Sequence, residues 1–116
     1  MPARRGRALM TPPGAAGAAL DSHAVLAALA EPRRADIVRL LERRHRSQGG
    51  LSAELGMSQP LVSHHLRVLR EAGLIESTVC ERVTVYQLRA TTLQTLAERL
   101  SAMAGRAAET CKVKPC

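Results

Sequence analysis

Four polar residues between positions 59 and 67 have side chains that can read the edges of base pairs. They are Gln59, Ser63, His64 and Arg67, and they share one face of an expected helix. The other face carries apolar residues at helical spacing, namely Val62, Leu66 and Leu69. Gln can pair with adenine and Arg with guanine, whereas Ser and His reach base edges or phosphates. The alternative is that these four residues form a polar helix face that contacts only solvent. The neighbouring elements distinguish between the two interpretations.

The elements around this helix favour the DNA interpretation. A short helix over 51–55 is closed by Gly56, and Ser47 to Gly50 before it is expected to be a loop. Ser58 caps the following helix, which carries Pro60 in its first turn and ends at Gly73. These are the proportions of a helix-turn-helix, and we place Pro60 with the four polar residues among the expected DNA contacts.

Two segments rich in Val and Thr, 76–80 and 83–88, flank Glu81 and Arg82 and predict a β-hairpin. A hairpin that follows a recognition helix is a wing. Arg82 at its tip can reach a phosphate or the adjacent minor groove. An exposed arginine without a partner is the alternative.

Three further helices are expected. The first is capped by Asp21 or Ser22 and runs to Ala30, and the second begins at Pro32 and ends near Arg44. A capping box of Thr91 and Gln94 begins the last helix. Its apolar stripe consists of Leu93, Leu96, Ala97, Leu100, Met103, Ala104 and Ala107, and Cys111 extends it. The expected fold is mainly α with a small β-hairpin, a winged helix-turn-helix over 21–110.

Composition limits the alternatives. The chain has 116 residues, a net charge of +7, one Tyr and neither Phe nor Trp, which disfavours an all-β fold and base stacking on aromatic rings. Its Ala-rich stripes bury little surface alone, so we expect a homodimer. No signal peptide or membrane span is recognisable, and an odd number of cysteines fits a reducing cytoplasm. Residues 1–20 are expected to be a disordered basic tail and 111–116 a cysteine-containing tail.

The pair His64-His65 invites a metal interpretation that its spacing does not favour. Adjacent helical residues point about 100° apart, so the two rings do not chelate one ion. We expect His64 to contact DNA and His65 to pack or to cap.

The segments LAEPRR at 29–34 and LGMSQPLVSHHLRVLREAGLI at 55–75, with Ile37 between them, resemble the ArsR/SmtB family of winged-helix repressors. The resemblance covers about residues 22–110. It implies a homodimer built from the first and last helices, bound to a palindromic operator. It also implies that Gln59, Ser63 and His64 occupy DNA-contacting positions. The family often has Gly at the wing turn where this chain has Glu81.

Most of the residues that bind metals in that family are absent from the matching positions of this chain. Ser47, Gln48 and Gly49 stand where one site has Cys-Val-Cys, and residues 91–111 lack the His and Asp of another. Cys80, Cys111 and Cys116 remain as soft donors, and trivalent arsenic or antimony favours three sulfurs. Some arsenite-sensing members carry cysteines at the end of the last helix. We therefore expect an arsenic-responsive repressor.

Other functions stay open. Cys111 can be a small buried apolar residue, or Cys111 and Cys116 can form a redox switch. A repressor of this fold with another ligand, and an architectural DNA-binding protein, are further alternatives. An enzyme is not expected, because no catalytic triad, phosphate loop or paired-carboxylate pocket is recognisable.

Overall fold

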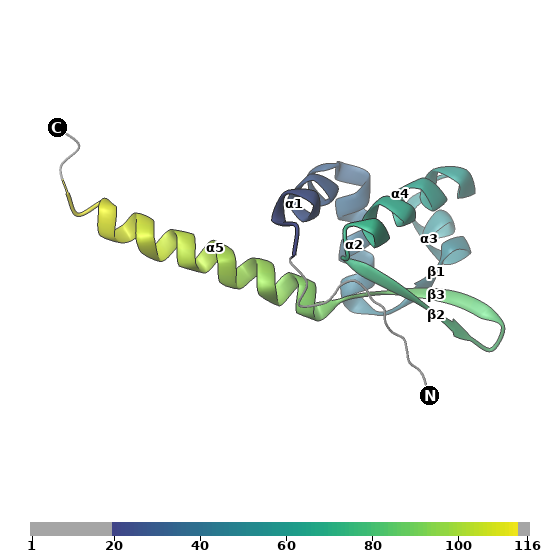
Figure 1. Cartoon of the computed structure of the whole chain (residues 1–116). Helices are drawn as coiled ribbons and strands as arrows, with labels where there is room; N and C mark the ends of the chain where they lie inside the picture. Colours follow the sequence, from purple (N-terminus) through teal and green to yellow (C-terminus); the bar gives the residue numbers. More distant parts are fainter. Residues whose placement is uncertain (1–19, 114–116) are drawn as a thin grey trace, which may run out of the picture.

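The computed structural model describes residues 20–113 and contains five helices and a three-stranded sheet within that range (Figure 1). In chain order the elements are α1 (Ser22–Ala30), α2 (Pro32–Arg43), β1 (Arg46–Ser47), α3 (Gln48–Leu55), α4 (Gln59–Glu71), β2 (Ile75–Cys80), β3 (Val83–Leu88) and α5 (Ala90–Thr110). The expected winged helix-turn-helix fold is confirmed. Expectations for residues 1–19 and 114–116 lie outside the described residues.

Local capping explains where most helices begin and end. The Asp21 carboxylate accepts a hydrogen bond from the amide of Ala24 at 3.1 Å, and the Ser58 hydroxyl accepts one from Leu61 at 3.3 Å. Both side chains satisfy amides that a helix start leaves free. Gly56 and Gly73 follow α3 and α4 with φ of +65° and +80°, the left-handed conformation that ends a helix.

The segment 47–50 differs from its prediction as a loop. Helix α3 already begins at Gln48, because the Ser47 hydroxyl accepts from the amide of Gly50 at 3.0 Å and caps it. Strand β1 precedes it and pairs with β3, so the expected hairpin is part of a three-stranded antiparallel sheet in the order β1-β3-β2. Tertiary pairing here overrides the low helix propensity of two glycines.

The predicted capping box of Thr91 and Gln94 is wrong. Helix α5 begins at Ala90 after Arg89, whose side chain makes no capping hydrogen bond. The Thr92 hydroxyl instead donates to the carbonyl of Gly73 at 2.6 Å. The start of α5 is therefore fixed by a contact with the end of α4 and not by its own first turn.

One hydrophobic core joins the helices and the base of the sheet. Its buried members are Val25, Ala28, Ile37, Leu41, Leu51, Val62, Leu66, Leu69, Leu74, Ile75 and Leu96. Three of them come from the inner face of α4, as the apolar spacing predicts. The core therefore determines which face of α4 remains outside.

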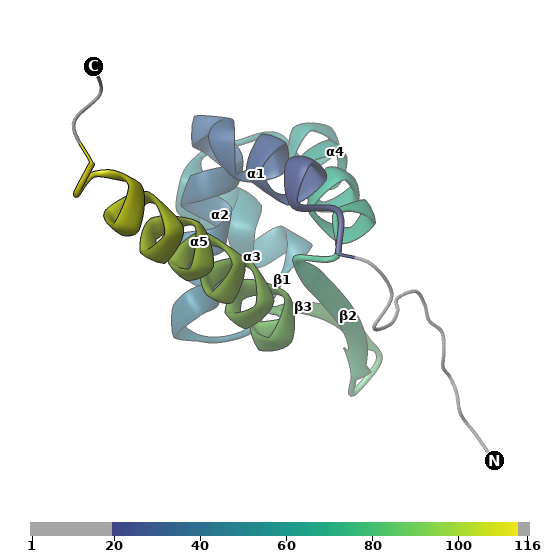
Figure 2. The same cartoon turned by 60° about the vertical axis from the view of Figure 1, so that its left-hand side comes forward.

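Helix α5 runs away from the other helices in Figure 1, and in Figure 2 it passes in front of them with its far end projecting beyond them. Its 21 residues span about 31 Å at 1.5 Å per residue. Leu96 is buried in the core, whereas Leu100 and Met103 further along are 45% and 57% exposed. Arg99 ties the helix to the start of α1 by donating to the Leu20 carbonyl and the Ser22 hydroxyl, both at 2.7 Å. The apolar stripe of α5 is thus covered only at its beginning.

Leu20 packs against the core just before helix α1. Among the described residues, no helix is long and apolar enough to cross a membrane.

Candidate nucleic-acid interface

The outer face of α4 carries the residues expected to contact DNA. Gln59, Pro60, Ser63, His64 and Arg67 are all exposed. The inner stripe of Val62, Leu66 and Leu69 is buried. The core thus directs the polar side chains outward, in the arrangement that lets a recognition helix enter a major groove.

Side-chain contacts fix the turn between α3 and α4. The Ser52 hydroxyl donates to the carbonyl of Met57, whose amide donates back to the Ser52 carbonyl at 3.2 Å. Gln48 at the start of α3 donates its side-chain amide to the carbonyl of Gln59 at 3.1 Å. The N-terminal end of α4 is therefore held against α3, which sets its angle to a duplex.

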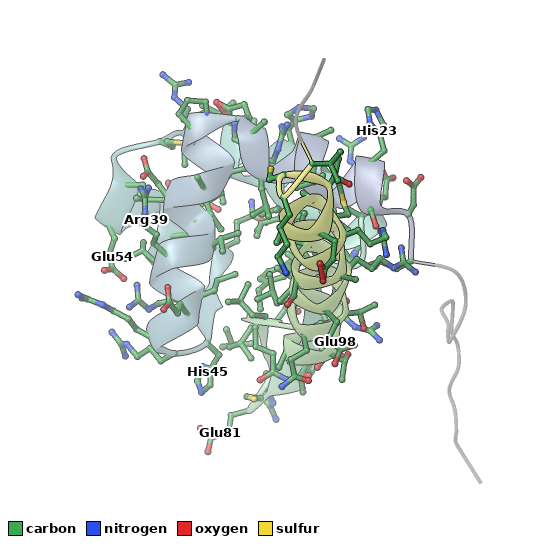
Figure 3. The ribbon with its side chains drawn as sticks, turned by 90° about the vertical axis from the view of Figure 1, so that its left-hand side faces the viewer. His23, Arg39, His45, Glu54, Glu81 and Glu98 are labelled. Atoms are coloured by element: carbon green, nitrogen blue, oxygen red, sulfur yellow. The ribbon has the colours of Figure 1, made fainter. Side chains whose placement is uncertain are left out.

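The wing is formed by β2 and β3, joined by a two-residue turn. Cys80 pairs with Val83, and the turn residues Glu81 and Arg82 have φ of +49° and +72°. Positive φ at both positions suits the twist of a hairpin, although Gly and Asn are the residues that adopt it easily. Figure 3 shows Glu81 pointing away from the body at the tip. Arg82 beside it is exposed, as a phosphate contact requires.

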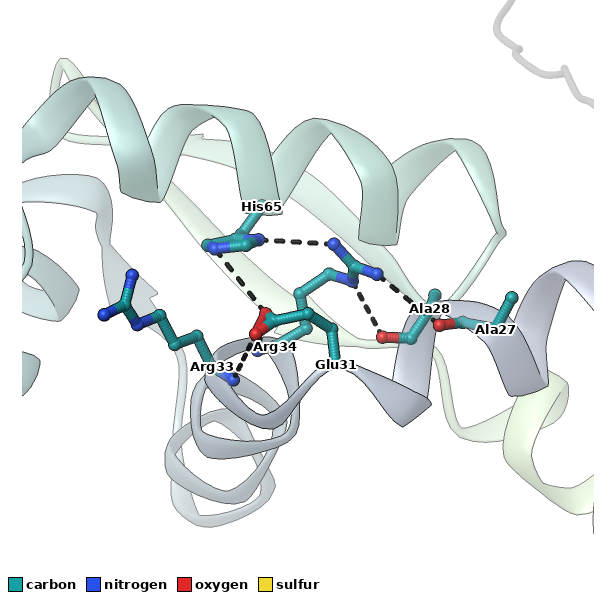
Figure 4. Close-up of polar contacts among 6 residues, drawn as sticks. All are labelled: Ala27, Ala28, Glu31, Arg33, Arg34 and His65. Carbon is teal, nitrogen blue, oxygen red and sulfur yellow. Dashed lines mark hydrogen bonds and ion pairs between the residues drawn. The ribbon is translucent and has the colours of Figure 1, made fainter.

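A polar cluster around the buried His65 lies behind α4, where α1 meets α2 (Figure 4). The Arg34 guanidinium donates to the carbonyl of Ala28 at 2.8 Å and approaches His65 Nδ1 to 3.4 Å. His65 Nε2 lies 3.6 Å from a Glu31 carboxylate oxygen and has no hydrogen-bond partner. The expected packing role of His65 is confirmed, since the residue is 5% exposed.

Burial and charge act on both titratable groups of this cluster. Burial lowers the pKa of His65 below its ordinary value of 6.5, and Arg34, His64 and Arg33 act in the same direction while Glu31 opposes them. The backbone amide of Arg33 is the main cause that lowers the pKa of Glu31 below 4.5. A neutral imidazole and an ionised carboxylate therefore lie next to Arg34.

The sequence did not reveal the position of Arg34. Its local sequence does not indicate a partner, but the side chain turns back to the end of α1 and donates to the carbonyls of Ala28 and Ala27. Glu31 gave a partial signal, because an acidic residue before Pro32 is typical of a helix start. Its carboxylate accepts from the amides of Arg33 and Arg34 at 3.1 and 3.3 Å.

The structure does not bring the expected cysteine ligands together. Cys80 is the last residue of β2 at the wing turn, and Cys111 directly follows α5. The wing turn and the end of α5 lie on opposite sides of the molecule in Figure 1. Both cysteines are free and exposed, so Cys111 is not buried in the single chain. Cys116 lies outside the described residues. Within residues 20–113, no group of three or more His, Cys, Asp or Glu side chains is placed to hold a metal ion.

Known proteins are similar to this chain in sequence and in fold. The sequence model described as "Bacterial regulatory protein, arsR family" matches residues 31–77. The chain is 31% identical over 70 residues to the transcriptional repressor SdpR of Bacillus subtilis (strain 168), covering 60% of this chain and 78% of that protein.

Two solved structures agree with that assignment. The ArsR-like transcriptional regulator from Rhodococcus sp. RHA1 is 30% identical, with a TM-score of 0.69 over 78% of this chain and 89% of that one. HlyU from Vibrio cholerae N16961 is 32% identical, with a TM-score of 0.59 over 71% of this chain and 89% of that one. The chain belongs to the ArsR family of bacterial transcriptional regulators, which are DNA-binding proteins and not enzymes.

Proposed function

We propose that this regulator is a homodimeric repressor that trivalent arsenic or antimony releases from DNA. Two copies would pair along α1 and α5 and present their α4 helices to a palindromic operator. Successive major grooves on one side of a duplex are about 34 Å apart, so the dimer must hold α4 and its copy at that spacing. A ligand that alters the pairing of α5 would change the spacing and weaken binding.

The exposed stripe of α5 is the observation that carries this proposal. Leu100 and Met103 continue the line of Leu96 beyond the core and are largely exposed, and Cys111 follows on the same stripe at the end of the helix. Apolar residues at this spacing are typical of helices that pair with another helix. A ligand bound to Cys111 would therefore act on the surface that a second copy covers.

The choice of ligand rests on donor chemistry. Thiolates are soft donors, and trivalent arsenic and antimony prefer sulfur to imidazole or carboxylate. Cys111 and Cys116 are five residues apart, close enough for one ion if the tail bends. Cys80 lies at the wing turn, on the opposite side of the molecule from the end of α5, so the proposal depends on the tail pair, and the contribution of Cys80 is tested separately.

A thiol-redox response is the second candidate. Free and exposed cysteines are the ones that peroxide reaches, and Cys80 and Cys111 are both of this kind. Oxidation of Cys111 and Cys116 to a disulfide would constrain the same end of α5 as a bound metalloid.

Titrating the operator-bound protein with arsenite, antimonite, cadmium and peroxide distinguishes these candidates. An operator duplex is first selected by the wild-type chain from a random library. Arsenite and antimonite should release the wild type and the Cys80→Ser variant, whereas the double variant Cys111→Ser/Cys116→Ser should stay bound.

Other results of this titration would point to a different signal or a different binding site. Release by peroxide alone supports the redox candidate, and normal arsenite release of the double variant overturns the tail site. A wild type that ignores all four reagents is a regulator without a cysteine-based signal.

A further inference from the structure

A shallow pocket lies between the outer part of α4 and strand β3. It is lined by Ser63, Leu66, Arg67, Arg70 and Tyr86 and has a volume of about 120 Å³. The buried Leu66 closes it on the inner side. The other four residues bring two guanidinium groups and two hydroxyl groups to one concavity.

The charge of this pocket is positive and uncompensated. Arg67 and Arg70 are exposed, and neither takes part in an ion pair within residues 20–113. No carboxylate lines the pocket. Glu76, the acidic residue of β2, hydrogen-bonds to Gln87, and residues 86 and 87 point to opposite faces of the strand. The pocket is therefore suited to an anion.

The pocket continues the stripe that reads base edges. Ser63, Arg67 and Arg70 stand at positions i, i+4 and i+7 of α4 and share a face with Gln59 one turn earlier. A duplex that presents its major groove to Gln59 and Ser63 would bring its sugar-phosphate backbone to the other end of the stripe. Phosphates border the groove on both sides, and Arg, Ser and Tyr are common phosphate contacts.

Tyr86 forms the strand side of the pocket. Its ring is half-buried against the hydrophobic core, and it pairs in register with Arg46, whose guanidinium is held by Glu54. A hydroxyl on a fixed ring loses little conformational entropy when it binds. The single aromatic residue of the chain thus holds a hydrogen-bond donor at the edge of the recognition helix.

We infer that this pocket binds one backbone phosphate of the operator, with Arg70 and Tyr86 as the contacts beyond the base-reading residues. The inference rests on the proposed operator binding. It makes Arg70 a source of affinity without sequence preference, because phosphates are the same for every base. Tyr86 adds a neutral hydrogen bond to the same phosphate.

The experiment compares the full chain with Arg70→Gln, Tyr86→Phe and, as a matched control, Arg43→Gln. Arg43 is an exposed arginine in the last turn of α2, outside the pocket. Affinity for the selected operator and for an unrelated duplex is measured over a range of salt concentrations. Arg70→Gln should weaken both by roughly tenfold and lower the slope of log K against log salt by about 0.9 per bound protomer.

The other two variants have different expected results. Tyr86→Phe should weaken binding by a few-fold without changing the slope, because it removes a donor without charge. Arg43→Gln should leave the slope unchanged. Equal slopes for Arg70→Gln and Arg43→Gln would overturn the inference, whereas a wild type that binds no selected duplex would instead overturn the proposed function.

Operators with a single neutral methylphosphonate locate the contact. One position in each half-site should weaken the wild type but not weaken Arg70→Gln further, since the two changes remove the same interaction. Additive losses at every position would contradict the pocket. Inorganic phosphate at matched ionic strength is the other source of this chemistry, and loss of the difference between wild type and Arg70→Gln in its presence would assign the pocket to the free ion.

Discussion

Arg34 and His65 meet behind the recognition helix, with guanidinium Nη1 3.4 Å from imidazole Nδ1. The same guanidinium donates to the carbonyls of Ala28 and Ala27 at 2.8 and 3.4 Å, at the end of α1. A guanidinium can only donate, so Nδ1 must be the acceptor and the proton of the neutral ring lies on Nε2. One side chain of α2 thus connects the end of α1 with the middle of α4, next to the exposed His64.

Acid should weaken this fold through His65. Well above pH 6.5 the ring is neutral in both folded and unfolded chains, so the full stability is present. As the pH falls below 6.5, the unfolded chain takes up a proton that the folded chain resists, because the folded pKa is lower. The free energy of unfolding should therefore fall between about pH 6.5 and 5, measured by urea titration.

Two substitutions isolate that effect. His65→Asn keeps an acceptor near the position of Nδ1 but does not titrate, so its stability should change less with pH over this range. His45→Asn is the matched control, because His45 is exposed and lies outside this cluster, and this variant should keep the wild-type slope. Glu31 contributes its own acid sensitivity only below its ordinary pKa of 4.5, outside this range. Equal slopes for the wild type and His65→Asn would refute the assignment.

Arg34→Gln should destabilise the protein by about 2 kcal/mol, because it leaves carbonyls at the end of α1 and His65 without their donor. The double variant Arg34→Gln/His65→Asn should lose less than the sum of the two single changes, since both disrupt one contact. Urea unfolding at pH 7.5 gives all four values, and Arg39→Gln, an exposed arginine on the same helix, is the control. Strict additivity would show that Arg34 and His65 do not interact.

Local patterns predicted much of this fold, and the misses share one physical cause. The spacing of Val62, Leu66 and Leu69 and the caps at Asp21 and Ser58 act within one or two turns, so the sequence alone was sufficient. Helix α3, the start of α5 and the side chain of Arg34 depend on partners distant in sequence. Ser47 lies in a strand paired with Val85, Thr92 binds Gly73, and Arg34 reaches α4.

In the candidate site, too, the features that depend on local sequence were predicted and those that depend on distant partners were not. The outward face of α4 followed from helical periodicity and is observed. The pocket residue Tyr86 was not predicted, because its place beside Arg70 depends on how β3 packs against α4. The metalloid site remains a prediction, since Cys116 lies outside the described residues.

The wing turn should tolerate more favourable residues. Glu81→Asn should raise the free energy of unfolding by about 0.5 kcal/mol, because Asn adopts positive φ more readily than Glu. Arg82→Gly should stabilise the turn for the same reason but weaken operator binding. Thermal unfolding and a binding titration on each variant measure both effects. A destabilised Glu81→Asn variant would show that the turn carries no strain of this kind.

The exposed stripe of α5 should control assembly. Met103→Glu places a carboxylate where two copies are expected to meet, and burying it without a partner opposes pairing by several kcal/mol. We expect sedimentation to show dimers for the wild type and monomers for this variant at the same concentration. Val79→Glu is the control, since Val79 is also apolar and exposed but lies on the wing. Monomeric wild type would remove the dimer from the proposed mechanism.

Substitutions of Arg67 and Arg82 should have different effects, because Arg67 is expected to contact a base and Arg82 the DNA backbone. Arg67 lies on the outer face of α4, so Arg67→Ala should relax preference at one base pair in each half-site, with a cost of about 1–3 kcal/mol at that position. Arg82 stands at the tip of the wing, so Arg82→Ala should weaken binding to all sequences alike if it contacts phosphate. Selection from a library of operator variants measures both results. A change of preference in the flanking base pairs of the Arg82→Ala variant would instead place this side chain in the minor groove, where an arginine senses the groove width of the sequence that it enters.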